Sequence, residues 1–165
     1  MDNIWKNKFE NANKKFPNQI ALEFCNKLYD ITNKKVIAKV EKYKVNINDM
    51  TEQSPLMNIA KINPLFSSTN VQDFLGEVDG KNKFTYELYL TGEKTSNYKY
   101  RFCFIEYSIC AYPVTVAIDS DIAKELEMSE IVHCKDDSEY EKVLIAILNS
   151  KKMTEVIEGL MKINS

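Results

Sequence analysis

The sequence predicts an α+β protein in which an antiparallel β-meander of about four to five strands packs against N-terminal and C-terminal helices. Residues 83–118 contain three β-rich runs separated only by turn-like segments, and apolar and polar side chains alternate in the first two. The flanking segments instead repeat apolar residues every three to four positions, which is typical of helices. We expect the meander to span about residues 71–118, with residues 35–45 as a further candidate strand, and residues 1–165 to form a single domain.

The N-terminal part should be helical over residues 3–33, with a break near Pro17. Trp5 and Phe9 mark the helical spacing before the break, and Ile20 and Phe24 mark it afterwards. Proline is tolerated in a first helical turn, so a second helix should start near Pro17. Residues 35–45 fit either a strand or a helix, and the turn-like residues 32–34 before them favour the strand.

Residues 46–70 have no sustained period but are too apolar for a free linker. We expect a packed irregular segment there, with a short helix near residues 56–61. A strand should follow at residues 71–79, with Phe74 and Val78 facing the core and a bulge at Gly76. Residues 79–82 then form a turn into the meander.

The alternation predicts which side chains of the two central runs face the core. The inward set comprises Phe84, Tyr86, Leu88, Leu90, Tyr98, Tyr100, Phe102 and Phe104. In an antiparallel pair, the numbers of directly opposed residues have a constant sum, and only an even sum keeps both sets inward. The register that meets this condition sets Leu88 against Tyr100 and Glu87 against Arg101, with residues 91–97 as the turn.

The C-terminal third returns to helices with readable starts. Ser120 is a candidate cap for a helix over residues 121–128, and Ser138 with Glu141 matches a capping box. Ser150 should open the last helix. Residues 131–133 form a short apolar run that can be a small strand between the first two helices, and the last helix should bury Val156, Ile157 and Leu160.

Few residues offer recognisable chemistry. His133 is the one histidine, and its neighbour Cys134 would point to the opposite face of a strand, which argues against a Cys–His dyad. Asp119 and Asp121 follow a strand, where divalent metals often bind, yet acids at a helix start also serve as caps. Glycine-rich phosphate loops and the G-x-S-x-G elbow are absent. We therefore name no catalytic residue, metal ligand or cofactor.

Charge and composition narrow the classes of partner. Residues 1–50 hold ten lysines against six acidic residues, whereas the chain as a whole has a net charge of −2. Arg101 is the one arginine, which argues against nucleic-acid readout, because that readout relies on arginine. Abundant lysine and asparagine with so little arginine is typical of AT-rich bacterial or phage genomes.

The compartment expected from the sequence is the cytoplasm. No apolar run approaches the roughly 20 residues that cross a bilayer, and the first residues lack the apolar core of a signal peptide. The four cysteines are scattered without a C-x-x-C pair, which favours reduced thiols over a disulfide framework. We expect no membrane partner, and the oligomeric state stays open.

The remaining functional signal is the second face of the meander. It should carry Glu87, Tyr89, Lys99, Arg101 and Tyr107, together with Cys103 and Ile105. Tyrosine and arginine are frequent at interface hot spots. This pattern favours a non-enzymatic protein of bacterial or phage origin that binds another protein, such as an immunity, inhibitor or adaptor protein. The alternatives are a small metal-dependent nuclease or hydrolase using Asp119 and Asp121, and a nucleic-acid binder using the N-terminal lysines.

Overall fold

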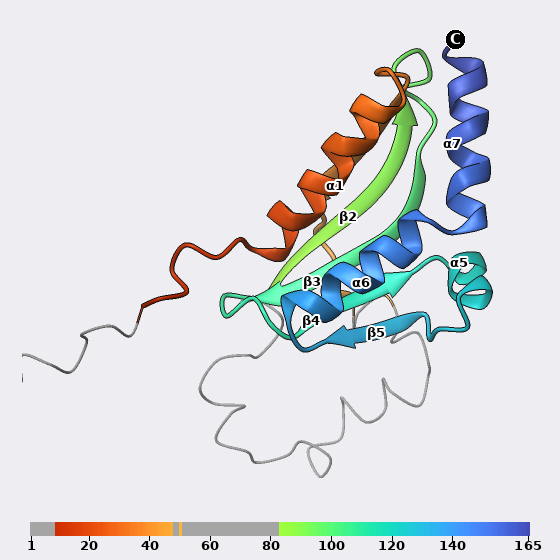
Figure 1. Cartoon of the computed structure of the whole chain (residues 1–165). Coiled ribbons are helices and arrows are strands. Elements are labelled where there is room, and N and C mark those ends of the chain that lie inside the picture. Colours follow the sequence, from red (N-terminus) through yellow and green to blue (C-terminus); the bar gives the residue numbers. More distant parts are fainter. Residues whose placement is uncertain (1–8, 48–49, 51–82) are drawn as a thin grey trace, which may run out of the picture.

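The computed structural model describes residues 9–47, 50 and 83–165 (Figure 1). Its helices flank one antiparallel sheet, which makes it an α+β fold, as the sequence predicts. In chain order the elements are α1 (Pro17–Ile31), β1 (Val36–Lys42), β2 (Lys83–Gly92), β3 (Tyr100–Ser108), β4 (Val114–Ile118), α5 (Ser120–Glu125), β5 (Ile131–Cys134), α6 (Asp137–Leu148) and α7 (Lys151–Ile163).

The five strands form one antiparallel sheet in the order β1-β2-β3-β4-β5. Each strand is hydrogen-bonded to its neighbour in sequence order, so the predicted meander is confirmed. Residues 36–42 form its first strand, which settles the ambiguity of that segment, and residues 131–134 form its last. The strand predicted at 71–79 and the short helix predicted near 56–61 lie outside the described residues.

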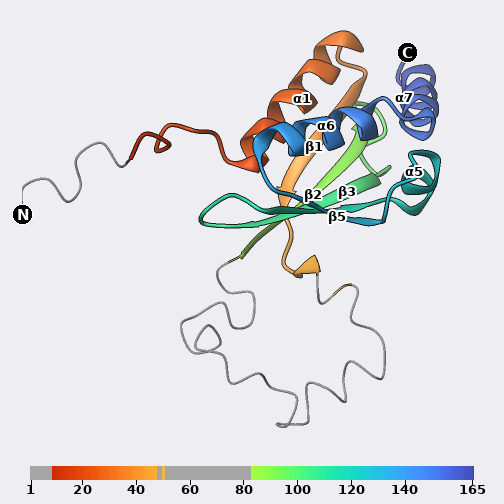
Figure 2. The same cartoon turned by 60° about the horizontal axis from the view of Figure 1, so that its bottom comes forward.

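The long helices α1, α6 and α7 lie on one side of the sheet, and the core is the layer between them (Figures 1 and 2). We call this side of the sheet the inner face and the other side the outer face. Every helix contributes to the same cluster of buried side chains, so the described elements share one core. The largest fully buried members are Phe102, Tyr140, Leu88, Leu90, Ile105, Ile122, Leu144, Ile147 and Met153.

Helix α1 begins at Pro17, as the proline predicts. The side chain of Gln19 accepts a hydrogen bond of 2.8 Å from the backbone N–H of Phe16, which satisfies one of the free amides at the helix start. The helix predicted before Pro17 is wrong for residues 9–16, which form isolated turns instead. There the backbone N–H of Ala12 donates to the carbonyl of Phe9, a contact that spans only three residues.

Aspartates, rather than the predicted serines, begin two of the C-terminal helices. Asp119 accepts a hydrogen bond of 2.9 Å from the N–H of Asp121 and caps α5, so Ser120 is the first helical residue. Asp136 caps α6 through the N–H of Glu139 at 2.8 Å, ahead of the predicted capping box. A carboxylate accepts from these amides more strongly than a hydroxyl because it also complements the positive helix end. The prediction for α7 is confirmed, since Ser150 is its cap.

The predicted register of β2 and β3 is wrong, and a β-bulge is the reason. Leu90 pairs with Tyr100 rather than with Tyr98, and Leu88 then pairs with Cys103, which leaves Phe102 as an extra residue between them. A bulge sets two residues of one strand against one of the other, so the alternation of faces shifts by one position. Both Phe102 and Cys103 are consequently buried in the core.

The shift exchanges the faces of every later residue of β3. Tyr107, which we expected on the partner-facing side, lies in the core and is 4% exposed, and its hydroxyl donates to Asn18 in α1 at 2.8 Å. Its predicted place in the binding face is therefore wrong. Cys103 and Ile105 are buried for the same reason, whereas Phe104, predicted to face inward, lies on the outer face.

Candidate functional site

The outer face is built from alternate residues of all five strands. Strand pairing places Glu87 beside Phe104, Phe104 beside Ala117 and Ala117 beside Ile131, so these four form one row across the sheet. On one side of this row, Lys39 of β1 lies beside Tyr89, and Tyr89 lies beside Arg101. On its other side, a third row runs in the order Thr85, Glu106, Thr115 and His133. Helices α1, α5, α6 and α7 all contribute to the core on the inner face.

Residues 43–47 cross one end of the outer face and are held there by Glu106. Its carboxylate oxygen Oε2 accepts two hydrogen bonds of 2.8 Å, from the N–H of Ile47 and from the hydroxyl of Thr85. Glu106 is 4% exposed, so these donors replace the water that a buried carboxylate loses. The segment places the ring of Tyr43 against the ring of Phe104, with ring centroids 4.9 Å apart.

Glu87, Lys99 and Arg101 form an ion cluster at the centre of this face, which we call the Glu87 cluster. Oε1 of Glu87 accepts from Nζ of Lys99 at 2.5 Å, and Oε2 accepts from Nε of Arg101 at 2.8 Å and lies 2.7 Å from its Nη2. The carboxylate is buried, with a side-chain exposure of 6%, while the two cationic side chains are 38% and 37% exposed. Glu87 therefore holds two cations in place at the surface.

Aromatic rings fix the orientation of both cations. Nζ of Lys99 lies 4.2 Å from the ring centroid of Tyr89. The guanidinium carbon of Arg101 lies 5.2 Å from the ring of Tyr43 and 5.0 Å from that of Phe104, within the range of cation–π attraction. Burial and a hydrogen bond with Glu41 raise the pKa of Tyr89 to about 12.

The structure thus brings four of the five sequence-predicted binding residues together. Glu87, Tyr89, Lys99 and Arg101 are in direct contact on the outer face, whereas Tyr107 lies in the core. Sequence reasoning missed Tyr43 and Phe104, whose rings lie next to each other against the guanidinium. Phe104 was assigned to the other face by the uninterrupted alternation, and nothing in the sequence links residue 43 to the central strands.

The two aspartates considered for a metal site have other partners. Both oxygens of Asp119 are engaged, one by the N–H of Asp121 and the other by the hydroxyl of Tyr100 at 2.6 Å. Asp121 points to Nζ of Lys152, 3.7 Å away. Within residues 9–47, 50 and 83–165, no group of three or more His, Cys, Asp or Glu side chains is placed to hold a metal ion. The contacts match the capping interpretation of this pair.

His133 and Cys134 point to opposite faces of β5, as the strand geometry predicts. Cys134 is 1% exposed in the core, while His133 is exposed and its Nδ1 lies 3.1 Å from the hydroxyl of Thr115. Burial raises the pKa of the Cys134 thiol to about 11, which opposes formation of a nucleophilic thiolate. This neighbouring pair does not form a nucleophile–base dyad.

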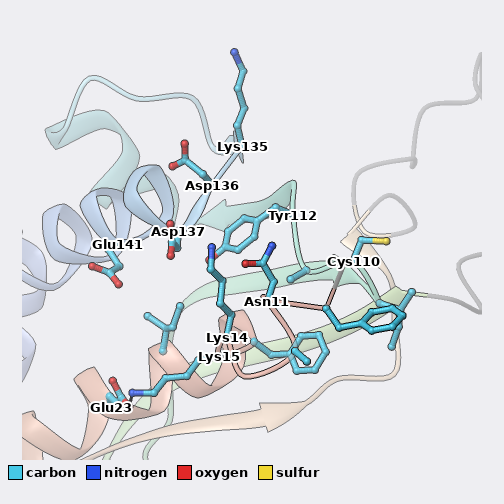
Figure 3. Close-up of a pocket in the computed structure, with 16 residues that line it drawn as sticks. Asn11, Lys14, Lys15, Glu23, Cys110, Tyr112, Lys135, Asp136, Asp137 and Glu141 are labelled. Carbon is cyan, nitrogen blue, oxygen red and sulfur yellow. Dashed lines mark hydrogen bonds and ion pairs between the residues drawn. The ribbon is translucent and has the colours of Figure 1, made fainter. Parts of the chain in front are cut away.

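A larger hollow lies on the inner side, between the turns before α1 and the start of α6 (Figure 3). It has a volume of about 640 Å³, and its walls carry Lys14 and Lys15 on one side and Asp136, Asp137 and Glu141 on the other. The ammonium of Lys15 forms an ion pair with Glu23. The walls mix both signs of charge without a dominant one, and the single histidine of the chain lies elsewhere, on β5.

Tyr112 also lines this hollow but does not make it a site. Its hydroxyl is buried and has no hydrogen-bond partner among the described residues. Burial and the nearby carboxylates of Asp137 and Glu141 raise its pKa to about 12. Because the oxygen itself is closed off from the hollow, a ligand there could not reach it without movement of the ring.

The N-terminal lysines of the nucleic-acid alternative are partly engaged within the chain. Lys15 pairs with Glu23, and Nζ of Lys27 lies 5.5 Å from the ring of Phe24. As for membranes, none of the helices in the described part of the chain combines the length and apolarity needed to cross a bilayer.

Comparison with known proteins does not place the chain in a family. No protein-family model matches the chain, and no match was found among curated proteins or among solved structures.

Proposed function

We propose that this chain binds another protein through the outer face of its sheet and that it acts by that binding rather than by catalysis. The observation that carries the proposal is the Glu87 cluster, in which a buried carboxylate fixes two exposed cations against aromatic rings. Pre-positioned arginine and aromatic side chains suit a hot spot, because less side-chain freedom is lost on association. An immunity, inhibitor or adaptor protein of bacterial or phage origin, acting in the cytoplasm, fits this description.

Apolar side chains beside the cluster support the same proposal. Phe104, Ala117 and Ile131 lie next to one another on the outer face and are each only half-buried. A binding patch typically combines an apolar centre with polar groups around it. The two alternatives have less support, since Asp119 and Asp121 are engaged as caps and in pairing, and two of the N-terminal lysines have partners within the chain.

The test is position-dependent cross-linking in cells that naturally produce the protein. A photo-reactive side chain is placed at Lys39, which is exposed on the outer face, and separately at Glu158, which is exposed on α7. We expect one protein to cross-link from position 39 and not from position 158. The cross-linked protein is then purified, and its affinity for the unmodified chain is measured.

A charge variant links any such complex to the proposed site. Arg101→Ala should weaken the purified complex by about tenfold or more, because interface arginines often contribute over 1 kcal/mol. Lys162→Ala, which removes an exposed cation from α7, is the matched control and should leave the affinity unchanged. Equal cross-linking from both positions, or an unchanged affinity of the Arg101 variant, would contradict the proposal.

A further inference from the structure

A shallow groove lies directly beside the Glu87 cluster on the outer face. It has a volume of about 230 Å³ and runs across β3, β4 and β5, with Phe104, Ala117 and Ile131 among its lining residues. Arg101 lines the groove from β3. The groove therefore places an apolar surface immediately next to a fixed guanidinium.

Arg101 retains hydrogen-bonding capacity towards the groove. A guanidinium has five N–H donors, of which Glu87 takes one from Nε and one from Nη2. No other acceptor among the described residues bonds to it, so about three donors are left. The rings of Tyr43 and Phe104 lie within cation–π range of the guanidinium and restrict its rotation.

The charges around the groove are arranged with a polarity. At the β3 margin, Lys99 and Arg101 carry two positive charges beside the buried carboxylate of Glu87, and Lys39 and Glu41 of β1 add one charge of each sign to the same face. At the opposite margin, the groove is lined by Glu130, which is exposed just before β5, whereas Asp119 at the end of β4 lies beside Phe102 of β3. An anionic group is therefore attracted to the β3 margin and repelled from the β5 margin.

We propose that the outer face receives an acidic segment of the partner protein, with an aspartate or glutamate carboxylate on Arg101 and Lys99 and an adjacent apolar side chain in the groove. This inference rests on the proposed function and names the chemistry of the partner. Arginine suits this role because its planar donors match the two oxygens of a carboxylate. The apolar neighbour gains by leaving water at Phe104, Ala117 and Ile131.

The single arginine of the chain makes the test direct. An ¹⁵N-labelled full-length chain has one arginine side chain, so its Nε–H signal reports on Arg101 alone. The probes are two short peptides, acetyl-Leu-Glu-Leu-amide and acetyl-Leu-Gln-Leu-amide, which differ only in the charge of the central side chain. Each is titrated to millimolar concentration at low salt.

We expect the glutamate peptide to shift the Arg101 signal in a saturable manner, and the glutamine peptide to bind at least about tenfold more weakly. Added salt should weaken the glutamate peptide selectively, because the charges are partly exposed. Lys99→Gln should weaken it by about threefold or more, whereas Lys162→Gln on α7 should have no effect. The folded state of each variant is checked from the same spectrum.

Three results would overturn the inference. Equal shifts with both peptides would mean that the groove binds only apolar side chains. No shift with either peptide would mean that Arg101 and Lys99 do not bind a carboxylate. A shift produced by a phosphate-bearing oligonucleotide but not by the peptides would assign the cations to nucleic acid. In the first two cases, cross-linking from position 39 that Arg101→Ala weakens would leave the proposed function standing without its acidic partner.

Discussion

Glu87 illustrates how much one buried side chain can organise on a sheet face where its neighbours Tyr89 and Glu106 are also buried. Its two oxygens hold Lys99 and Arg101, and it has only a 6% exposed side chain. A buried carboxylate is costly without partners, whereas the two cations can be rehydrated because they are more than a third exposed. Replacing Glu87 is therefore expected to lower the free energy of unfolding more than replacing Lys99.

Glu87→Gln tests this inequality. The variant leaves an amide facing two cations, and it should lower the free energy of unfolding by about 1–3 kcal/mol, the range for hydrogen bonds to charged groups. Lys99→Gln is the control, since an exposed member of an ion pair contributes about 0–1 kcal/mol. Urea unfolding of both variants at neutral pH measures the difference. Similar losses in the two variants would show that the carboxylate does not organise the cluster.

Phe102 is the residue at which the observed strand pairing departs from the pairing that the sequence predicts. Aromatic residues recur at every second position from Tyr98 to Phe104, which indicates a regular strand, although residues 102–105 are all apolar. The bulge places both Phe102 and Cys103 in the core, where they pack among apolar side chains. That packing depends on the helices opposite the strand, which a strand's own sequence does not encode.

At the scale of elements, hydrogen bonds hold the C-terminal end of α7 against the loop between β2 and β3. The side chain of Asn164 at its end accepts from the N–H of Lys94 at 2.6 Å and donates to the hydroxyl of Thr95 at 3.2 Å. On the helix itself, Met153 and Leu160 are buried, while Val156 and Ile157 are only half-buried. The prediction that all of Val156, Ile157 and Leu160 are buried is confirmed only for Leu160.

Leu160→Ala should lower the free energy of unfolding by about 2–5 kcal/mol, because Leu160 is 3% exposed in the core and the truncation leaves a cavity. The measurement is urea or thermal unfolding by circular dichroism. Ile163→Ala, at an exposed position of the same helix, is the control and should change stability by less than about 0.5 kcal/mol. A loss below about 1 kcal/mol for Leu160→Ala would contradict a core role for α7.

Two glycines provide an opposed pair of predictions. A Cβ at Gly92, the last residue of β2, would collide with the side chains of Asn164 and Thr95, so Gly92→Ala should cost about 1–3 kcal/mol. A Cβ at Gly159, inside α7, would meet no atom, and Gly159→Ala should stabilise the protein by about 0.5–1 kcal/mol. Thermal unfolding compares them. A stabilising Gly92→Ala would show that the Asn164 contact is not tight.

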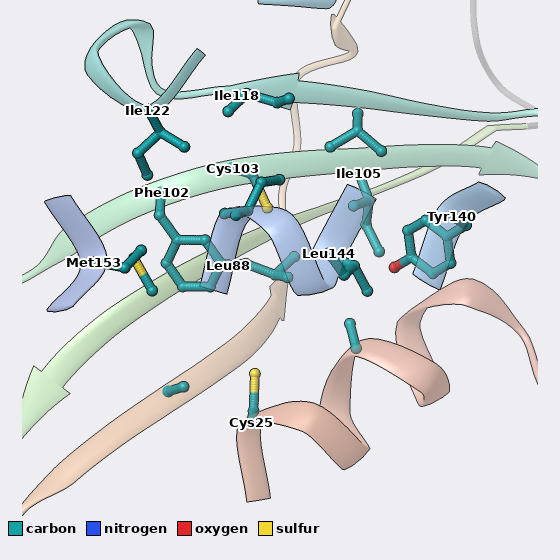
Figure 4. Packing of buried hydrophobic residues seen from close by; sticks show 14 of the residues in the cluster. Cys25, Leu88, Phe102, Cys103, Ile105, Ile118, Ile122, Tyr140, Leu144 and Met153 are labelled. Atoms are coloured by element: carbon teal, nitrogen blue, oxygen red, sulfur yellow. The ribbon is translucent and has the colours of Figure 1, made fainter. Parts of the chain in front are cut away.

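At the scale of the whole molecule, the core carries ionisable groups that stay neutral to a higher pH in the folded chain than in the unfolded chain. Figure 4 shows Cys25 of α1 and Cys103 of β3 among the packed apolar side chains. Burial raises the pKa of Cys25 to about 12 and that of Cys103 well above its ordinary value. Burial likewise raises the pKa of Tyr140.

The protein should consequently lose stability at alkaline pH. Unfolded thiols ionise near pH 9, so above that pH the unfolded chain binds fewer protons than the folded chain, and the free energy of unfolding falls. The contribution of Cys25 is complete below about pH 9 and is lost at about 1.4 kcal/mol per pH unit as the pH rises towards 12. Urea midpoints measured between about pH 8 and 10.5 with a reductant should show this decline.

Cys25→Ala separates this linkage from a packing effect. The smaller side chain lowers stability at every pH, but it should make the decline above pH 9 less steep by about 1.4 kcal/mol per unit, because one titrating group is gone. An unchanged slope would mean that the thiol of Cys25 ionises in the folded state too. Cys110 is exposed, so Cys110→Ala should leave the slope as it is.

The sequence by itself determined the α+β class and the succession of β2, β3 and β4 in the meander. Those properties follow from local signals, namely the two-residue alternation in β2 and β3, the three- to four-residue spacing in the helices, and the turn and cap residues between them. Four of the five expected binding residues could be named for the same reason, because Lys99 and Arg101 precede the bulge in β3, and Glu87 and Tyr89 lie on β2, which has no extra residue.

The tertiary structure decided the register, the face of Tyr107 and the contacts of Arg101. The bulge is favoured by packing against α1, α6 and α7, and Tyr43 reaches Phe104 through residues 43–47, which Glu106 holds on the sheet. These are contacts between residues distant in sequence, with energies that depend on the assembled core rather than on any local pattern. A period of two in a strand states which residues alternate, but only packing on one side selects the position at which the alternation is interrupted.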